Sequence, residues 1–427
     1  MSRELPFNVS KLMTLRLFVG CVCMWAIVGS EVWGEENAVP SFSLQEIIDL
    51  TLTHNPTIEL GKGFIDQKTG EERIARAYPN PTLGLQGGRG QILDPTGRTM
   101  FERYISLSQP LEWPGMRAAR QEAAKAGAGS AQAGFALTQV NVKARVKQIF
   151  YELLLAQTIA DLASRLLMTV TDFEGAVKRR VEAGEAPPFE EVKVKVELLQ
   201  AQKQMEQTQG KVRITKVALD QLTAGNLGEG FAIQGDFETT NNALDESHLI
   251  EAAFEHHPEI KKFQQLIDVA HAQYDQERQA RVPNVTISGS YQRDAGREGF
   301  VGGLSIPLPL WDQRQGDMAK ALGIRRQSEA HLEQAKISLK RGITEHVQIS
   351  RTASTQINTF EQGLLKQAKE AVRIARTSFK FGEAGLLDVL DAQRVLWQTF
   401  EGYAHARFEL AIALTELERL VGKELDG

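Results

Sequence analysis

Cysteine is almost absent from this chain of 427 residues. Its two cysteines, Cys21 and Cys23, both lie near the N-terminus. Beyond residue 23 the sequence therefore excludes a disulfide framework, a thiolate metal site and a cysteine nucleophile.

The hydrophobic run near the N-terminus is too short to span a bilayer. Leu17 to Ser30 is an uncharged stretch of 14 residues, whereas a membrane-spanning helix needs about 20. Arg3, Lys11 and Arg16 precede this stretch, and acidic residues follow it from Glu35. The pattern predicts that residues 1–34 form a cleaved secretory signal peptide.

A lipoprotein signal is the alternative for the same segment. Phe18-Val19-Gly20-Cys21 resembles a lipoprotein cleavage box. Acylation of Cys21 would leave the apolar residues 22–28 directly after the lipid, where a polar tether is expected. We therefore favour the cleaved signal peptide, and lipidation of Cys21 stays open.

The chain has no excess of positive charge. Its net charge of -5 and its isoelectric point near 6.0 argue against a nucleic-acid partner, because nucleic-acid-binding proteins usually have a basic surface. Motifs for nucleophilic or metal-assisted hydrolysis are also missing. We expect no enzymatic activity and no cofactor.

The sequence is a tandem duplication. His54-Asn55-Pro56 returns as His256-His257-Pro258, and three further markers recur in the same order, with offsets of 202, 204, 197 and 198 residues. Such repetition means that one copy alone need not close a core. The markers divide the chain into a first repeat at 35–222, a linker at 223–245 and a second repeat at 246–427.

Each repeat contains a long helical hairpin. Apolar residues follow a seven-residue rhythm over four heptads between Val142 and Val170, which is typical of coiled-coil packing. The stretches 116–183 and 313–382 contain no proline, and each helix would be on the order of 100 Å long. A glycine-containing link ends each stretch, which predicts an antiparallel hairpin.

Each repeat also contains two strands, placed between a shorter leading helix (43–77 and 246–281) and the long one. Val285, Ile287 and Tyr291 alternate with small polar residues, as do Phe300, Leu304 and Ile306 with Val301, Gly303 and Ser305. The first copy shows a weaker alternation around Leu83 and Leu107. The length of about ten residues suits a tilted membrane strand. The apolar face must be covered by helices or by lipid around a closed barrel, and the polar face favours a water-filled interior.

This order of elements behind a signal peptide resembles the TolC family of outer-membrane efflux channels, over about residues 43–422. The most specific motifs are residues 77–81, residues 108–117 and Phe381 to Gln393. The second motif is most similar to that of the cobalt-zinc-cadmium (heavy-metal) efflux branch. Members of this branch usually have Gly-Lys-Arg where this chain has Gly115-Met116-Arg117.

The resemblance implies a mainly α fold with a membrane β-barrel. Four strands per chain complete a twelve-stranded trimeric barrel in the outer membrane, and coiled-coil hairpins form a tunnel that extends into the periplasm. It implies a homotrimer that works with a periplasmic adaptor and an inner-membrane pump, commonly proton-driven. The cargo would be heavy-metal cations, with organic-compound or drug efflux and type I secretion as alternatives. A soluble periplasmic coiled-coil scaffold or adaptor is the rival reading.

The candidate site residues lie at the hairpin ends. We expect the adaptor to dock on the tips, Gly184 to Phe189 and Gly382 to Leu387. The residues assigned to this role are Gly184, Glu185, Ala186, Gly382, Glu383 and Ala384.

Two aspartates are the candidate periplasmic gate. By resemblance, Asp388 and Asp391 match aspartates that line the closed entrance, although carboxylates at a helix start also favour the helix dipole. Three copies would form a ring of acidic groups that selects cations. The family's tip arginine falls at Ala384, so the contacts that hold the gate must differ here.

Two histidine-containing patterns could suggest a metal. His256-His257 and the helical spacing of Asp268, His271 and Asp275 lack the remaining ligands of a usual protein site. Solvated helix side chains explain them equally well, and we expect no metal site.

Overall fold

The computed structural model describes residues 40–91, 97, 99–228, 230–237, 244–294 and 297–425. Residues from Pro40 onward form one compact unit. The predicted signal peptide and Cys21 lie outside the described residues, as does part of the predicted linker.

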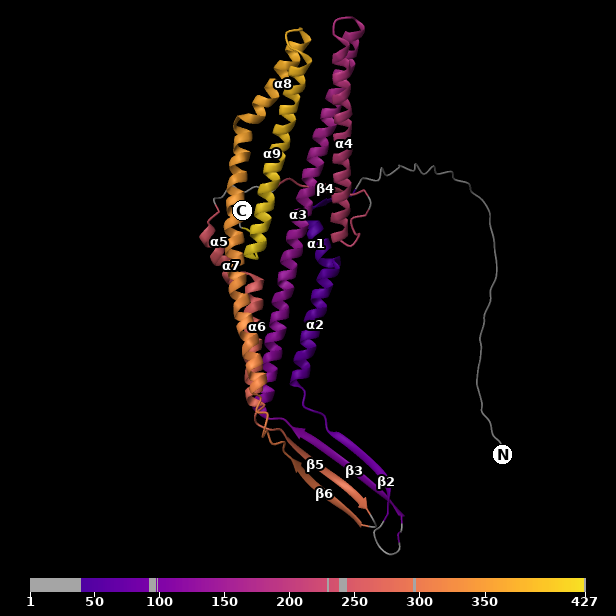
Figure 1. The fold of residues 1–427 in the computed structure, drawn as a ribbon, viewed down its shortest axis with the longest axis vertical. Coiled ribbons are helices and arrows are strands. Elements are labelled where there is room, and N and C mark those ends of the chain that lie inside the picture. Colours follow the sequence, from indigo (N-terminus) through magenta and orange to yellow (C-terminus); the bar gives the residue numbers. More distant parts are fainter. Residues whose placement is uncertain are drawn as a thin grey trace, which may run out of the picture. The chain divides into compact units, whose positions relative to one another are not determined.

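The described unit consists of helices, several of them long, one four-stranded sheet and one small parallel sheet of two strands (Figure 1). The helices are α1 (Leu44–His54), α2 (Pro56–Arg76), α3 (Pro114–Glu182), α4 (Pro188–Leu222), α5 (Glu246–His256), α6 (Pro258–Gln279), α7 (Gln315–Thr359), α8 (Leu365–Lys380) and α9 (Leu386–Val421), with a π-turn η1 (Phe360–Leu364) between α7 and α8. The strands are β1 (Ser41–Ser43), β2 (Thr82–Gln91), β3 (Thr99–Leu111), β4 (Ala232–Gln234), β5 (Val285–Asp294) and β6 (Arg297–Ser305).

The four-stranded sheet is antiparallel and combines the two repeats in the order β2-β3-β5-β6, while β1 and β4 pair in parallel as a separate small sheet. The register of the four-stranded sheet aligns Leu85, Ile105, Tyr291 and Phe300 in one cross-strand row. Along β3 the residues of this face are exposed, whereas those of the opposite face are less so, as in a sheet that curls around its small polar side. β6 ends at Ser305, one residue before the predicted end, because Pro307 lacks an N–H for the ladder.

The two largest hydrophobic cores of the described residues hold the middle of the helices together. One surrounds Phe150 and Leu153 of α3, with Ile47, Leu219 and Phe231 packed on them. The other, in the second repeat, centres on Ile343 of α7. α3 also packs against α6 and α9, so it joins the two repeats. α3 carries a stretch that is apolar enough by composition to cross a membrane, but it lies among α2, α4, α6 and α9.

The second long helix is interrupted, unlike the predicted continuous stretch 313–382. At η1 the helix makes one π-turn. The Phe360 ring packs edge-on against Tyr403, with centroids 5.9 Å apart, and lies so close to Gly402 that an added Cβ there would be 3.0 Å from the ring. This aromatic contact fixes the turn against α9.

Each leading helix, predicted as one element, is broken in two at the same place in both repeats. Pro56 and Pro258 occupy the first positions of α2 and α6, where a missing N–H costs nothing. Asn55 caps α2 by accepting from the Thr57 N–H at 2.8 Å, and its amide donates to the Leu222 carbonyl at 2.8 Å.

His257 takes the same role in the second repeat. Its Nδ1 accepts from the Glu259 N–H at 3.3 Å, so the ring proton must be on Nε2, which lies 3.2 Å from the Arg419 carbonyl. The side chain is 1% exposed. Burial lowers the pKa of His257 to about 4, because the charged imidazolium would lose its hydration.

We predict that the second repeat loses stability in acid through this histidine. The unfolded side chain titrates near 6.5 and the folded one near 4. The stability is therefore full above pH 6.5 and falls as the pH drops toward 4, by at most about 3 kcal/mol. His257→Asn should abolish this dependence, while costing about 1 kcal/mol at pH 7.5 because the shorter side chain loses the bond to the Arg419 carbonyl.

Thermal unfolding by circular dichroism at pH 7.5, 5.5 and 4 measures this effect. His256→Asn, at the exposed neighbouring histidine, is the matched control and should behave as the parent does. If the melting temperatures of the parent and of His257→Asn change with pH in parallel, protonation of the buried imidazole is not coupled to folding.

Candidate functional site at the hairpin tips

The two hairpin tips have the same backbone geometry. At the first, Gly184 has φ of +74°, the Gly184 N–H donates to the Val181 carbonyl at 3.0 Å and the Glu185 N–H donates to the Arg180 carbonyl at 2.8 Å. Gly382 also has φ of +74°. The Gly382 N–H donates to the Phe379 carbonyl at 3.1 Å, and the Glu383 N–H donates to the Ser378 carbonyl at 2.9 Å, which is the same pattern. Both are Schellman turns, which require glycine at the left-handed position.

The predicted docking residues differ in exposure. Gly184, Glu185, Gly382 and Glu383 are exposed, and Ala384 is half-buried. Ala186 is only 9% exposed in the single chain, so its side chain offers little surface for a contact.

Exposed apolar side chains also mark both tips. Phe189 and Leu387 occupy equivalent positions at the start of α4 and α9 and are 62% and 59% exposed. Phe381 is 77% exposed. Water-exposed aromatic and aliphatic groups of this size, together at one end of the helices, are typical of a protein-binding surface.

The two hairpins pack against each other just behind the tips. Val177 of α3 and Val194 of α4 form one buried cluster with Phe379, Leu386 and Val389 of the second hairpin. The tips are therefore held together and do not project independently.

Arginine–aromatic contacts reinforce this cluster in both directions. The Arg180 guanidinium of α3 lies 4.9 Å from the Phe379 ring centre, and that of Arg376 of α8 lies 5.5 Å from the Phe173 ring centre. Arg376 also donates to the Thr169 hydroxyl at 3.5 Å. With its amide oxygen turned toward Arg376, the buried Gln393 accepts from Nε at 3.1 Å.

These contacts join the hairpins although Ala384 offers no arginine. Sequence reasoning did not find them, because an arginine or phenylalanine on an amphipathic helix gives no sign of its partner on another hairpin. We refer to Arg180, Arg376, Phe173 and Phe379 as the inter-hairpin clasp.

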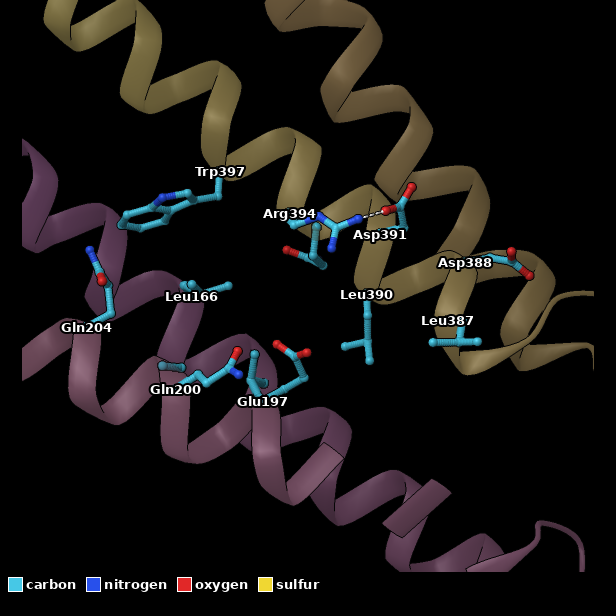
Figure 2. A pocket seen from close by; sticks show the side chains of 13 residues that line it. Leu166, Glu197, Gln200, Gln204, Leu387, Asp388, Leu390, Asp391, Arg394 and Trp397 are labelled. Carbon is cyan, nitrogen blue, oxygen red and sulfur yellow. Dashed lines mark hydrogen bonds and ion pairs between the residues drawn. The ribbon is translucent and has the colours of Figure 1, made fainter. Parts of the chain in front are cut away.

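Asp388 and Asp391 line a groove of about 600 Å³ between α9 and the first hairpin (Figure 2). The Asp388 carboxylate accepts from the Gly385 N–H at 2.9 Å, and so caps the start of α9. Asp391 forms an ion pair with Arg394. Glu197 of α4 lines the same groove. The site thus holds three carboxylates and one guanidinium, and both aspartates are exposed in the single chain.

The histidines do not gather into a metal site. The described residues contain no group of three or more histidine, cysteine, aspartate or glutamate side chains arranged so that they could hold one metal ion. His271 Nδ1 lies 3.5 Å from the Asp275 carboxylate, an exposed contact along α6, and His257 is committed to its helix cap.

The outer membrane efflux protein family matches residues 47–225 and 249–423. The chain belongs to this family. The two matched segments correspond to the two repeats and include both tips. The predicted family and the predicted outer-membrane efflux channel, located in the outer membrane and extending into the periplasm, are confirmed. The family consists of transport proteins, in agreement with the absence of an enzyme motif.

Two individual proteins are similar in sequence to most of this chain. The cobalt-zinc-cadmium resistance protein CzcC of Cupriavidus metallidurans is 29% identical over 399 residues, which cover 90% of this chain and 93% of CzcC. Protein CyaE of Bordetella pertussis is 25% identical over 69% of this chain and 66% of its own length.

Solved channels confirm the predicted fold. The outer membrane protein VceC of Vibrio cholerae matches with a TM-score of 0.75 at 17% identity, covering 90% of this chain and 97% of VceC. The open-state channel MtrE of Neisseria gonorrhoeae gives 0.72 at 19% identity and covers 89% of each chain. CusC gives 0.77 at 16% identity, covering 90% of this chain and 93% of CusC.

We predict that the clasp keeps the tips together. Arg376→Met removes the contacts to Phe173, Thr169 and Gln393, and the loss of a cation–π pair costs about 0.5–2 kcal/mol. Cysteines placed at Glu185 and Glu383 can carry spin labels, because residues 24–427 have no cysteine of their own. The distance distribution between the labels should broaden in Arg376→Met.

Arg373→Met is the matched control, since Arg373 lies on the same helix and, among the described residues, forms an ion pair with Glu370 alone. It should leave the distribution narrow. Equal distributions in the two variants would refute a role for the clasp.

Proposed function

We propose that this protein is the trimeric outer-membrane channel of a tripartite efflux system that exports heavy-metal cations. The identity to the cobalt-zinc-cadmium resistance protein CzcC, which extends over 90% of this chain, carries the assignment of cargo. The sequence around Gly115-Met116-Arg117 also resembles that branch.

The open edges of the single chain support a ring of several copies. Within the described residues β2 and β6 each pair on one side only, and unpaired strand edges are not tolerated in hydrocarbon. α2 and α4 lie on one side of the helices and α7 and α8 on the other (Figure 1). Joining opposite edges repeatedly gives a rotationally symmetric ring, and the family resemblance sets the number at three.

Both helical edges carry exposed apolar side chains that such a ring would cover. On the first edge these are Leu60, Phe64, Ile74, Val192, Val196, Leu199, Ile214 and Val217; on the second they are Ile337, Ile349, Leu364 and Ile374.

The periplasmic adaptor is proposed to dock on the tips. The exposed Gly184, Glu185, Gly382 and Glu383, with the apolar Phe189, Leu387 and Phe381 beside them, support this assignment. The adaptor would connect the channel to an inner-membrane pump, proposed to be proton-driven.

A strain that lacks this protein should lose tolerance to Co²⁺, Zn²⁺ and Cd²⁺, and the intact gene should restore it. Tolerance to organic dyes and detergents should not change. A strain sensitive to the organic compounds alone would overturn the cargo assignment while leaving the channel itself intact.

Tip variants should separate docking from assembly. Gly184→Val and Gly382→Val place a branched side chain at φ of +74°, where a side chain costs about 1–2 kcal/mol. The turns will distort, so metal tolerance should fall to the level of the deletion strain while trimer amounts stay normal. Gly175→Val, within α3 where an added Cβ meets only the Arg179 side chain at 3.6 Å, is the control. Unchanged crosslinking to the adaptor in the tip variants would contradict this docking site.

Asp388 and Asp391 are proposed as the periplasmic gate. Three copies would place six carboxylates near one axis, and each Arg394 would offset part of that charge. Asp388→Asn together with Asp391→Asn should weaken cation selectivity and remove block by a trivalent cation. The amide oxygen at position 388 can still cap α9, so assembly should persist.

Single-channel recording in planar bilayers measures both properties. Glu383→Gln removes an exposed tip carboxylate and should leave them unchanged. If the double variant keeps the block of the parent, Asp388 and Asp391 act only as helix N-terminal charges.

A further inference from the structure

Arginines occupy the apolar face of the sheet at its hairpin end. Arg103 of β3 lies directly opposite Arg293 of β5 in the antiparallel register, and both are exposed. They follow the row of Leu85, Ile105, Tyr291 and Phe300 on the same face, since side chains two residues apart point to the same side. Arg89 is one step further, diagonal to Arg103. Figure 1 shows β3 and β5 as the two central strands.

The height of this pair agrees with a headgroup position. Trp113, half-exposed, and Trp311, almost fully exposed, lie at the helix end of the sheet, where aromatic residues mark a membrane interface. Arg103 precedes Trp113 by ten residues. At about 3.3 Å per residue and about 40° of tilt, this gives about 25 Å of height, which is the usual thickness of the apolar band of a membrane barrel. With the tunnel extending into the periplasm, this height would place the arginines at the outer-leaflet boundary.

Within the part of the chain that the structure describes, neither the arginine pair nor Arg89 makes an ion pair with a carboxylate. Glu298, the cross-strand partner of Arg293, accepts instead from the Tyr291 hydroxyl at 2.9 Å. Like charges directly opposite each other destabilise a sheet, so an anion held between the two guanidinium groups would relieve their repulsion.

We propose that Arg103 and Arg293, assisted by Arg89, bind the phosphate of an anionic lipid headgroup in the outer leaflet. A guanidinium offers a planar fork that matches phosphate oxygens. Two forks from neighbouring strands would hold one phosphate between them and relieve their repulsion. The acyl chains would run along Ile105, Tyr291 and Phe300. The inference rests on the proposed function in one respect, namely that this face of the sheet is the one turned toward lipid.

The test uses the purified trimer in mild detergent and native mass spectrometry. The probe is diphosphorylated lipid A, with the dephosphorylated lipid as its partner. The parent should retain the phosphorylated lipid at least tenfold more tightly than the dephosphorylated one. Arg103→Gln with Arg293→Gln should lose this preference.

Arg297→Gln is the matched control, because Arg297 lies at the same end of the sheet on the opposite face. It should bind as the parent does. Equal binding by the double variant and the parent overturns the site. Loss of binding in Arg297→Gln alone overturns the proposed orientation of the sheet, a result distinct from failure of the arginine pair. Complete displacement by millimolar inorganic phosphate would show a free-anion site and overturn the lipid assignment. Only variants recovered as intact trimers enter the comparison, and the contrast between the two lipids on the parent needs no variant.

Discussion

A backbone N–H or C=O group cannot stay unpaired in hydrocarbon. This constraint governs the chain from the sheet outward. Four strands satisfy their inner hydrogen bonds and leave β2 and β6 open, so the chain cannot be complete in a membrane by itself. The helical part has the same character, since its two lateral edges present apolar side chains to solvent. Both the sheet and the helices therefore need neighbouring copies of the chain, which pair with the open strand edges and cover the apolar side chains.

The two repeats form the same local structure with different residues. Both leading helices break before a proline, yet the cap is an amide in one repeat and an imidazole in the other, each reaching a carbonyl near the end of a long return helix. Only the imidazole can gain a proton in the accessible pH range. Equivalent positions therefore share geometry without sharing chemistry.

Sequence periodicity predicted the elements better than their partners. The strands follow from alternation at Val285, Ile287 and Tyr291, and the hairpin tips follow from Gly184 and Gly382, because these signals are local. The breaks at Asn55 and His257 were missed, although a proline after a capping residue was visible in both copies.

Other features depend on long-range contacts that no local pattern contains. The π-turn depends on Phe360 meeting Tyr403 across two helices. The clasp depends on Arg376 finding Phe173, more than two hundred residues earlier in the chain. At the site, the spacing of Asp388 and Asp391 predicted a carboxylate pair at the start of a helix, but Arg394 and Glu197 complete the groove only in three dimensions. The low exposure of Ala186 was equally hidden.

The common geometry of the two tips has a consequence for stoichiometry. Three chains in a ring present six Schellman turns with the same backbone shape but two kinds of side chain, Phe189 in one and Leu387 in the other. For a partner that recognises the backbone, the ring has pseudo-sixfold symmetry and offers six equivalent binding sites. To a partner that distinguishes the aromatic ring from the aliphatic chain, it has true threefold symmetry and offers three.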